Sequence, residues 1–157
     1  MEKIAVYAGS FDPFTDGHLS IVKEAAELFD TVYIVIAKNA NKKRFSDVEM
    51  MRNAIETTLE QNGLMNCSVA ILSDGLVADY CKLVNAQYLV RGLRNTSDYL
   101  YEENIAKINA EINPTLKTVY FRATNEVVSS SMVRELFGYG KDVSRYLPEE
   151  VLRVVVR

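Results

Sequence analysis

Residues 3–18 read KIAVYAGSFDPFTDGH, and this stretch decides the fold class. Lys3 to Ala8 alternates with β-branched and aromatic residues, which predicts a strand. Gly9 to Asp16 is rich in turn-forming residues, and Gly17 to Phe29 carries apolar residues at helical spacing. A strand, a loop and a helix in this order form the opening unit of a doubly wound α/β fold.

Strands and helices keep alternating along the rest of the chain. Residues 31–37 form a continuous apolar run, which is typical of a central strand covered on both faces. We predict further strands at 68–72, 88–90 and 118–122, and helices at 46–63, 77–84, 98–112, 130–137 and from Pro148. The expected architecture is α/β: a single Rossmann-like doubly wound domain over residues 1–157, with a five-stranded parallel sheet and helices on both faces.

The composition excludes several classes of protein. With 48% hydrophobic residues, 7 Gly and 3 Pro among 157 residues, the chain is not disordered or of low complexity. Its 18 Lys and Arg against 21 Asp and Glu give a net charge of −3, so no overall basic field attracts nucleic acid or an anionic membrane. Residues 1–30 show neither a signal-peptide pattern nor an apolar run of about 20 residues, so we expect a cytoplasmic protein without nucleic-acid or membrane partners.

The two cysteines do not predict a metal or redox site. Cys67 and Cys81 have no C-x-x-C spacing and no neighbouring histidine, which argues against zinc and against a redox pair. We therefore expect two buried free thiols.

The loop after the first strand carries residues suited to phosphate. It lacks the G-x-G-x-x-G and G-x-x-x-x-G-K-[ST] patterns, but Gly9 permits close backbone approach and Ser10 offers a hydroxyl. Thr15 or Asp16 can cap the helix, which leaves His18 in its first turn beside the positive end of the dipole. The dipole lowers the pKa of a histidine there, whereas a bound triphosphate raises it. The alternative is that His18, the only histidine, merely packs or caps.

Three other segments lie near predicted carboxyl ends of strands or at a late helix start. They are Lys42-Lys43-Arg44-Phe45-Ser46, Arg91-Gly92-Leu93-Arg94 with Asp98, Tyr101 and Glu102, and Ser129-Ser130-Ser131-Met132-Val133-Arg134. Taken singly, they also fit a solvated charge run, surface salt bridges and a helix N-cap. Gathered at one edge of the sheet, they would form an anion pocket in an otherwise acidic protein.

Residues 9–18 resemble the T-x-G-H form of the nucleotidyltransferase signature, in which the histidine touches the α- and β-phosphates of a nucleoside triphosphate. The whole chain resembles the bacterial phosphopantetheine adenylyltransferases, which join ATP and 4′-phosphopantetheine to give dephospho-coenzyme A and pyrophosphate. The chain departs from that family at Ser10, where threonine is usual, and at Ala8, where proline is common. It also has Asn125-Glu126-Val127 where relatives often place an aromatic residue.

This resemblance implies roles for individual residues. The catalytic residues would be His18, Lys42 and Ser10. The 4′-phosphopantetheine would contact Ser10, Lys42, Leu76, Val77, Arg91 and Asn109. ATP would contact Ser10, Phe11, His18, Gly92, Arg94, Asp98, Tyr101, Glu102, Val128, Ser129, Ser130 and Ser131. The resemblance further implies Mg²⁺ that arrives with ATP, no metal ligand on the protein, and a homohexamer.

Two other functions fit parts of the sequence. A mononucleotide adenylyltransferase or a cytidylyltransferase would share the fold and the chemistry, but those enzymes usually carry a second histidine where this chain has Thr15. A noncatalytic nucleotide-binding or sensor module would be expected to have lost His18 or Lys42, and both are present.

Overall fold

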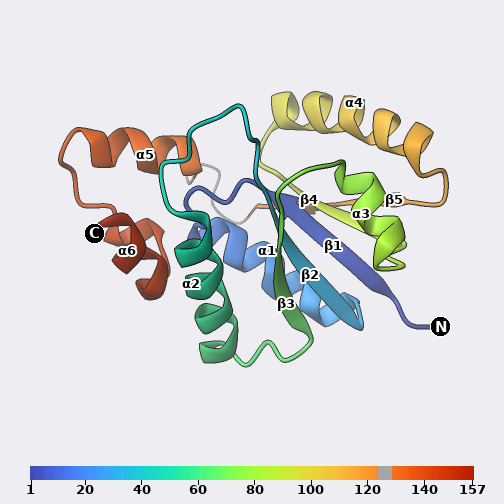
Figure 1. The fold of residues 1–157 in the computed structure, drawn as a ribbon, viewed down its shortest axis with the longest axis horizontal. Helices are drawn as coiled ribbons and strands as arrows, with labels where there is room; N and C mark the ends of the chain where they lie inside the picture. The colour runs from blue at the N-terminus through green and yellow to red at the C-terminus, as the bar shows by residue number, and fades with distance from the viewer. Residues whose placement is uncertain (124–128) are drawn as a thin grey trace.

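The computed structural model describes residues 1–123 and 129–157 and contains one parallel five-stranded sheet (Figure 1). The strands are β1 (Ile4–Gly9), β2 (Thr31–Ala37), β3 (Cys67–Leu72), β4 (Tyr88–Leu93) and β5 (Lys117–Arg122). Their order across the sheet is β3-β2-β1-β4-β5, and all neighbours pair in parallel. The predicted α/β class and parallel sheet are confirmed.

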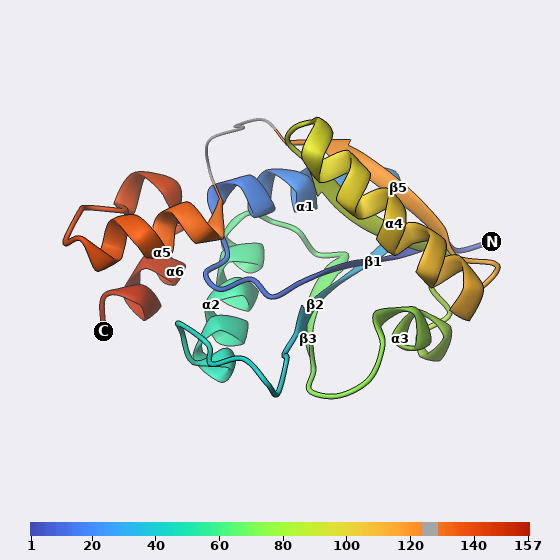
Figure 2. The same ribbon diagram turned by 90° about the horizontal axis from the view of Figure 1, so that it is seen from above.

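Helices connect the strands and extend the chain beyond the sheet. They are α1 (Asp16–Leu28), α2 (Val48–Gln61), α3 (Val77–Leu83), α4 (Thr96–Ile112), α5 (Ser130–Gly138) and α6 (Glu149–Val155), with a short 3-10 turn at Ser144–Tyr146. Figures 1 and 2 show α5 and α6 beyond the sheet, on the side of α2. Over the described residues, none of these helices is both long and apolar enough to cross a membrane.

Side chains that alternate along β1 pack into two separate cores. Ala5 and Tyr7 belong to a core with α1 and α2, whereas Val6 and Ala8 belong to a core with α3 and the end of α4. Helices therefore cover both faces of the sheet, as the pattern predicts. This double cover explains why β2 reads as a continuous apolar run.

Most element boundaries differ from the prediction by one or two residues, and two differences bear on the site. The fourth strand continues past Val90 to Leu93, because Arg91 to Leu93 pair with Tyr120 to Arg122 of β5. Arg91 and Gly92 thus lie in the strand and do not follow it. Helix α4 begins at Thr96, ahead of Asp98, because the Asn95 side chain caps it by accepting a hydrogen bond from the Asp98 N–H.

The cysteines are free, and one of them is fully buried. Cys81 is buried, whereas Cys67 is only half-buried, so the prediction of two buried thiols is wrong for Cys67. Burial raises the pKa of both thiols to about 11, which keeps them protonated at neutral pH.

The strand order places a crevice between β1 and β4. Strand β1 pairs with β2 on one side and with β4 on the other, so the connections on its two sides run in opposite directions. The carboxyl ends of β1 and β4 are neighbours, with Tyr7 opposite Val90. Open α/β sheets bind ligands at such a switch point.

Candidate active site

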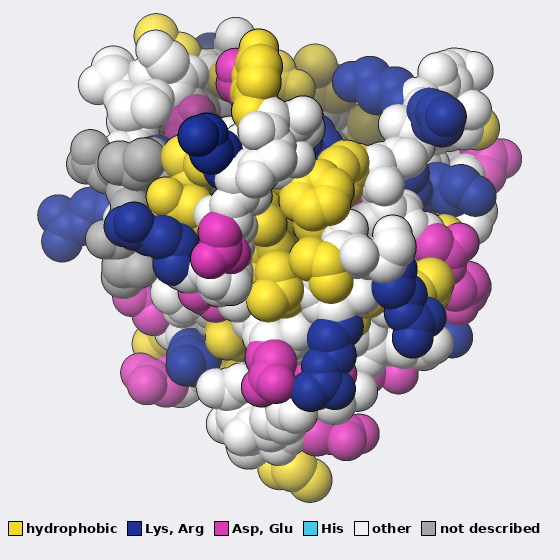
Figure 3. Space-filling model, turned by 90° about the vertical axis from the view of Figure 1, so that its left-hand side faces the viewer, with side chains coloured by type: hydrophobic (Ala, Val, Ile, Leu, Met, Phe, Trp, Pro, Cys, Tyr) yellow, Lys and Arg dark blue, Asp and Glu magenta, His cyan; other side chains and the backbone are white. Residues whose placement is uncertain are grey.

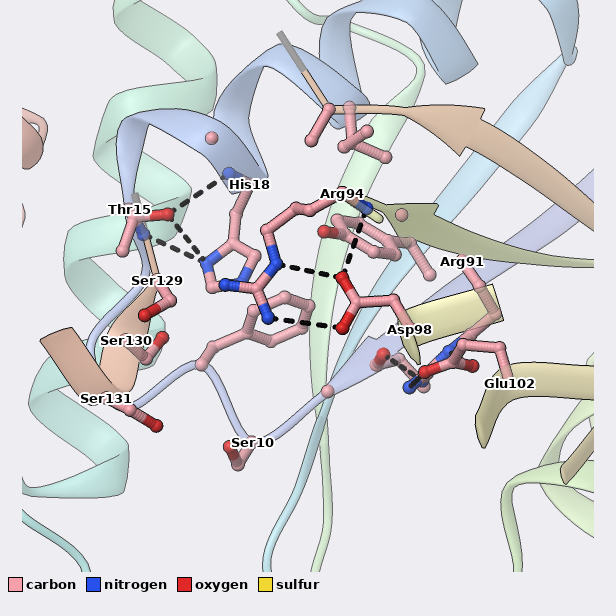
Figure 4. Close-up of a pocket in the computed structure, with 18 of the residues that line it drawn as sticks. Ser10, Thr15, His18, Arg91, Arg94, Asp98, Glu102, Ser129, Ser130 and Ser131 are labelled. Carbon is pink, nitrogen blue, oxygen red and sulfur yellow. Dashed lines mark hydrogen bonds and ion pairs between the residues drawn. The ribbon is translucent and has the colours of Figure 1, made fainter. Parts of the chain in front are cut away.

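A cavity of about 340 Å³ opens at the carboxyl ends of β1 and β4. We call it the His18 cavity. It brings together most residues that the sequence assigns to ATP, namely Ser10, Phe11, His18, Gly92, Arg94, Asp98, Glu102, Ser129, Ser130 and Ser131, and also Arg91. In Figure 4 the three serines of α5 stand on one side, Arg91 and Glu102 stand on the other, and His18 and Arg94 lie between them.

His18 is held in one orientation by the start of α1. Thr15 is the N-cap: its Oγ1 accepts from the His18 N–H at 3.3 Å, and its own N–H donates to His18 Nδ1 at 3.0 Å (Figure 4). The imidazole thus takes the place that a Glu or Gln side chain has in an ordinary capping box. Because Nδ1 accepts a hydrogen bond, the neutral ring carries its hydrogen on Nε2, which has no partner among the described residues and can donate to a ligand.

The surroundings of His18 favour the uncharged ring. Phe11 and Phe14 lie against it, with ring centroids at 4.9 Å and 5.5 Å. Burial, together with the positive charges of Arg94 and Arg91, lowers the pKa of His18 to about 3. The alternative that His18 caps the helix is correct, and the same residue also lines the cavity.

The two predicted arginines are already paired with carboxylates. Arg91 binds Glu102 through Nε and Nη2 at 2.6 Å and 2.8 Å, and its Nη1 donates to the carbonyl of Ala8 at 2.7 Å. Arg94 binds Asp98 through Nε at 3.0 Å. Both arginines thus form salt bridges, as the alternative expects, but the pairs line the cavity and are not on the open surface. Bidentate carboxylates hold each guanidinium in a defined plane, and they balance its charge before any ligand arrives.

The serines at the start of α5 cap this helix and join it to the loop that precedes α1 through Ser130. Ser129 caps α5 by accepting from the Met132 N–H, so the N-cap alternative is correct for that residue. Ser130 Oγ donates to the Pro13 carbonyl at 2.8 Å. The N-terminal ends of α1 and α5 therefore meet at the cavity, where both helix dipoles favour an anion.

A second hollow, of about 640 Å³, lies at the carboxyl end of β2. We call it the Lys42 hollow; it is lined by Ser10, Asp12, Ala37, Asn39, Lys42, Lys43, Arg44, Phe45 and Arg134. Ser10 and Arg134 line both this hollow and the His18 cavity. Within the described part of the chain, the Lys42 ammonium group forms no ion pair. Its charge is therefore available to a ligand.

Known proteins resemble this chain over nearly its whole length. Residues 6–136 match the model of the cytidylyltransferase-like family. Phosphopantetheine adenylyltransferase of Vesicomyosocius okutanii is 39% identical over 154 residues, covering 96% of this chain and 95% of the relative. That of Cytophaga hutchinsonii is 40% identical over 153 residues, covering 96% and 100%. The chain belongs to the phosphopantetheine adenylyltransferase family.

A solved structure supports the fold. A protein of Vibrio parahaemolyticus, described as a nicotinate-nucleotide adenylyltransferase, superposes with a TM-score of 0.73 at 19% identity, covering 99% of this chain and 93% of that one. The cytidylyltransferase-like match contains every residue that lines the His18 cavity, since these run from Tyr7 to Arg134. Helix α6 lies outside it.

Some residues expected from the phosphopantetheine adenylyltransferase family lie elsewhere. Leu76, Val77, Asn109 and Tyr101 line neither the His18 cavity nor the Lys42 hollow. Tyr101 is 65% exposed, because adjacent helix positions point about 100° apart and Glu102 is the one that turns inward to Arg91. Asp98 and Glu102, four positions apart, share one face of α4. Val128 and residues 125–127 lie outside the described residues.

The cavity also contains Tyr7, which sequence reasoning missed, and Arg134, which it named only as part of the segment 129–134 and without a role. Tyr7 lines it from β1 and is only 5% exposed. Burial raises the pKa of Tyr7, so the group stays a donor. Arg134 Nη1 donates to the Asp12 carbonyl at 2.8 Å. Its position three residues after Ser131 on one helix was the available signal.

Proposed function

We propose that this protein transfers AMP from ATP to 4′-phosphopantetheine, giving dephospho-coenzyme A and pyrophosphate. The observation that carries the proposal is that Ser10 and Arg134 border both the His18 cavity and the Lys42 hollow. A triphosphate in the cavity and an acceptor phosphate in the hollow would thus meet at Ser10. The relatives named phosphopantetheine adenylyltransferase support the same reaction.

The reaction needs no covalent intermediate. An oxygen of the acceptor phosphate attacks the α-phosphorus of ATP in line, forms the new P–O bond, and the bond to pyrophosphate breaks. Because this nucleophile is anionic at neutral pH, the protein need not remove a proton from it. The neutral His18 suits this requirement: its Nδ1 is occupied by the Thr15 N–H, and Nε2 donates to oxygens that gain charge in the transition state.

The other residues of the site position phosphate oxygens. The uncompensated charge of Lys42 attracts the acceptor phosphate, and the meeting ends of α1 and α5 attract the triphosphate. Glu102 and Asp98 orient Arg91 and Arg94, whose remaining N–H groups can still donate to ligand oxygens.

Magnesium fits this site as a companion of ATP. Among the described residues, no three His, Cys, Asp or Glu side chains gather into a metal site, and the cavity carboxylates Asp98 and Glu102 are paired with arginines. Mg²⁺ commonly keeps several waters and binds through substrate phosphates, where it neutralises developing charge. We assign no protein ligand to it.

The proposal includes a homohexamer in the cytoplasm, as the family resemblance implies. Hydrophobic side chains gather on the face that carries α5 and α6 (Figure 3), where Tyr139 and Val156 are exposed. Leu100, Tyr101 and Ile108 are exposed along α4. Apolar surface of this extent supports contacts between copies.

The deciding experiment compares three acceptors with ATP and Mg²⁺ by pyrophosphate release. We expect turnover of 4′-phosphopantetheine, none of pantetheine, whose hydroxyl would need a base, and little of nicotinamide mononucleotide, which lacks the long arm. A preference for the mononucleotide would point to a mononucleotide adenylyltransferase. Binding of ATP without turnover of any acceptor would point to a sensor module.

A further inference from the structure

We infer that Arg44 is a positioning residue, which together with Asp12 locks the loop of residues 39–46 onto the loop of residues 10–13. The locked contact sets the place of Lys42 relative to His18. The inference rests on the proposed function, in which Lys42 receives the acceptor phosphate. It assigns to Arg44 a role different from the adjacent lysines of the same basic run.

Arg44 reaches across to the loop that follows β1. Its Nη1 donates to the Ser10 carbonyl at 2.7 Å, and its Nη2 donates to the Phe11 carbonyl at 3.3 Å. Its Nε donates to the Ser46 carbonyl within its own loop at 3.0 Å. The planar guanidinium thus ties together backbone from two segments, which a single ammonium group has no geometry to reproduce.

Asp12, in the loop that follows β1, binds the backbone of the loop that carries Arg44. Its two carboxylate oxygens accept from the backbone N–H groups of Phe45 and Ser46 at 2.7 Å and 2.8 Å. Asp12 also lies 3.5 Å from Arg44 Nη2, and the two side chains are only 11% and 12% exposed. Because each loop supplies a charged side chain to the backbone of the other, the contact fixes both. Removing one partner would leave the other charge largely buried without its opposite charge.

Among the described residues, the loop that carries Lys42 has one other attachment, the ring contact of Phe45 with Phe137, and no polar one. In the described part of the chain, every hydrogen bond that leaves residues 39–46 ends on Ser10, Phe11 or Asp12. His18, by contrast, is held by Thr15 and by aromatic packing, and Arg44 reaches it only indirectly, through the backbone carbonyl of Phe11. Loss of the contact should therefore displace Lys42 and leave the triphosphate ligands in place. A displacement of about 1 Å can reduce a rate about 100-fold.

The test uses two variants. Arg44→Lys keeps the positive charge, and Arg44→Met keeps only an unbranched apolar side chain without charge. The control is Arg153→Met, since Arg153 is exposed on α6 and pairs only with Glu149 and Glu150. We expect kcat/KM for 4′-phosphopantetheine to fall about 10- to 100-fold in both Arg44 variants. The Kd of ATP, measured by calorimetry without acceptor, should change less than about threefold. A change of this size is small enough to arise without loss of a contact to ATP. Hydrogen exchange of backbone amides in residues 44–47 should become faster, and the control should match the wild type.

Three results would overturn the inference. Wild-type kcat/KM in Arg44→Lys would show that charge alone suffices, and equal losses in ATP affinity and in acceptor kcat/KM would show a general disruption of the site. Unchanged exchange in residues 44–47 would show that Arg44 does not lock the loop. If the wild type adenylylates no acceptor, the proposed function fails, and exchange still decides the role of Arg44. If Arg44→Met does not fold, Arg44→Lys, which keeps charge and most of the length, carries the test.

Discussion

Replacing His18 by alanine removes two contacts of different kinds. The Nε2–H group leaves the His18 cavity, and the hydrogen bond from the Thr15 N–H to Nδ1 leaves the start of α1. A single donor that acts on transition-state charge contributes about 2.7–4 kcal/mol, so kcat should fall about 10²- to 10³-fold. Loss of the hydrogen bond from the Thr15 N–H should lower the free energy of unfolding by about 1 kcal/mol. The loss in rate should therefore far exceed the loss in stability.

Two further variants separate the two nitrogens. The side-chain amide of His18→Gln reaches the position of Nε2 and keeps a donor in the cavity, whereas that of His18→Asn ends near Nδ1 and keeps an acceptor for the Thr15 N–H. We expect His18→Gln to retain a kcat at least about tenfold above that of His18→Asn, and to be at least as stable, because Gln is an ordinary capping-box residue at this position.

The assay is the steady-state release of pyrophosphate with saturating ATP, Mg²⁺ and 4′-phosphopantetheine, beside urea unfolding of each variant. Circular dichroism establishes that the variants fold. A kcat for His18→Ala near that of the wild type would reduce His18 to a helix cap. Equal kcat values for the Gln and Asn variants would refute the assignment of the donor to Nε2.

The remaining predictions concern charge, pH and assembly. Lys42→Ala should lower kcat and weaken acceptor binding, whereas Lys43→Ala should have a smaller effect on both. Because both side chains line the same hollow, comparable losses in the two variants would indicate an unspecific basic patch. The free energy of unfolding should decrease as the pH falls below 6.5 toward about 3. In this range the unfolded chain binds a proton at His18, whereas the folded chain, in which the pKa of His18 is lowered to about 3, does not. The measurement is the urea midpoint of wild type and of His18→Gln, each near neutral pH and about one pH unit below the ordinary pKa of histidine. The midpoint of the wild type should fall more than that of the variant. Equal falls in the two proteins would contradict the prediction. Light scattering should give about six times the mass of one chain, and the mass of a single chain at micromolar concentration would exclude the hexamer.

The local sequence was sufficient for the element types and for the first loop of the site. Strands and helices follow from residue periodicity within short windows, so the alternation over 157 residues predicted a parallel α/β sheet that the structure confirms. His18 was placed correctly beside the start of α1 for the same reason: helix capping by Thr15 involves residues three positions apart.

Errors arose where distant segments decide the outcome. The strand containing Arg91 was ended too early, because only pairing with Tyr120 of β5 continues it. Tyr101 was assigned to ATP together with Glu102, but the contact between Glu102 and Arg91 turns Tyr101 to solvent, outside the His18 cavity, so its contact with ATP stays a prediction. The sequence offered salt bridges at Arg91 and Arg94 only as an alternative, and the folded structure decided that Glu102 and Asp98 are their partners.

The sequence by itself determined the kinds of elements, their chain order and the residues of the loop that bears His18, because each depends on neighbours a few positions away. Tertiary structure alone decided the strand order β3-β2-β1-β4-β5, which brings the ends of β1 and β4 together. It also decided the lowered pKa of His18 and the contact of Arg44 with Ser10, 34 positions apart. Burial and hydrogen bonding between distant segments exist only in the folded chain, and no local pattern encodes them.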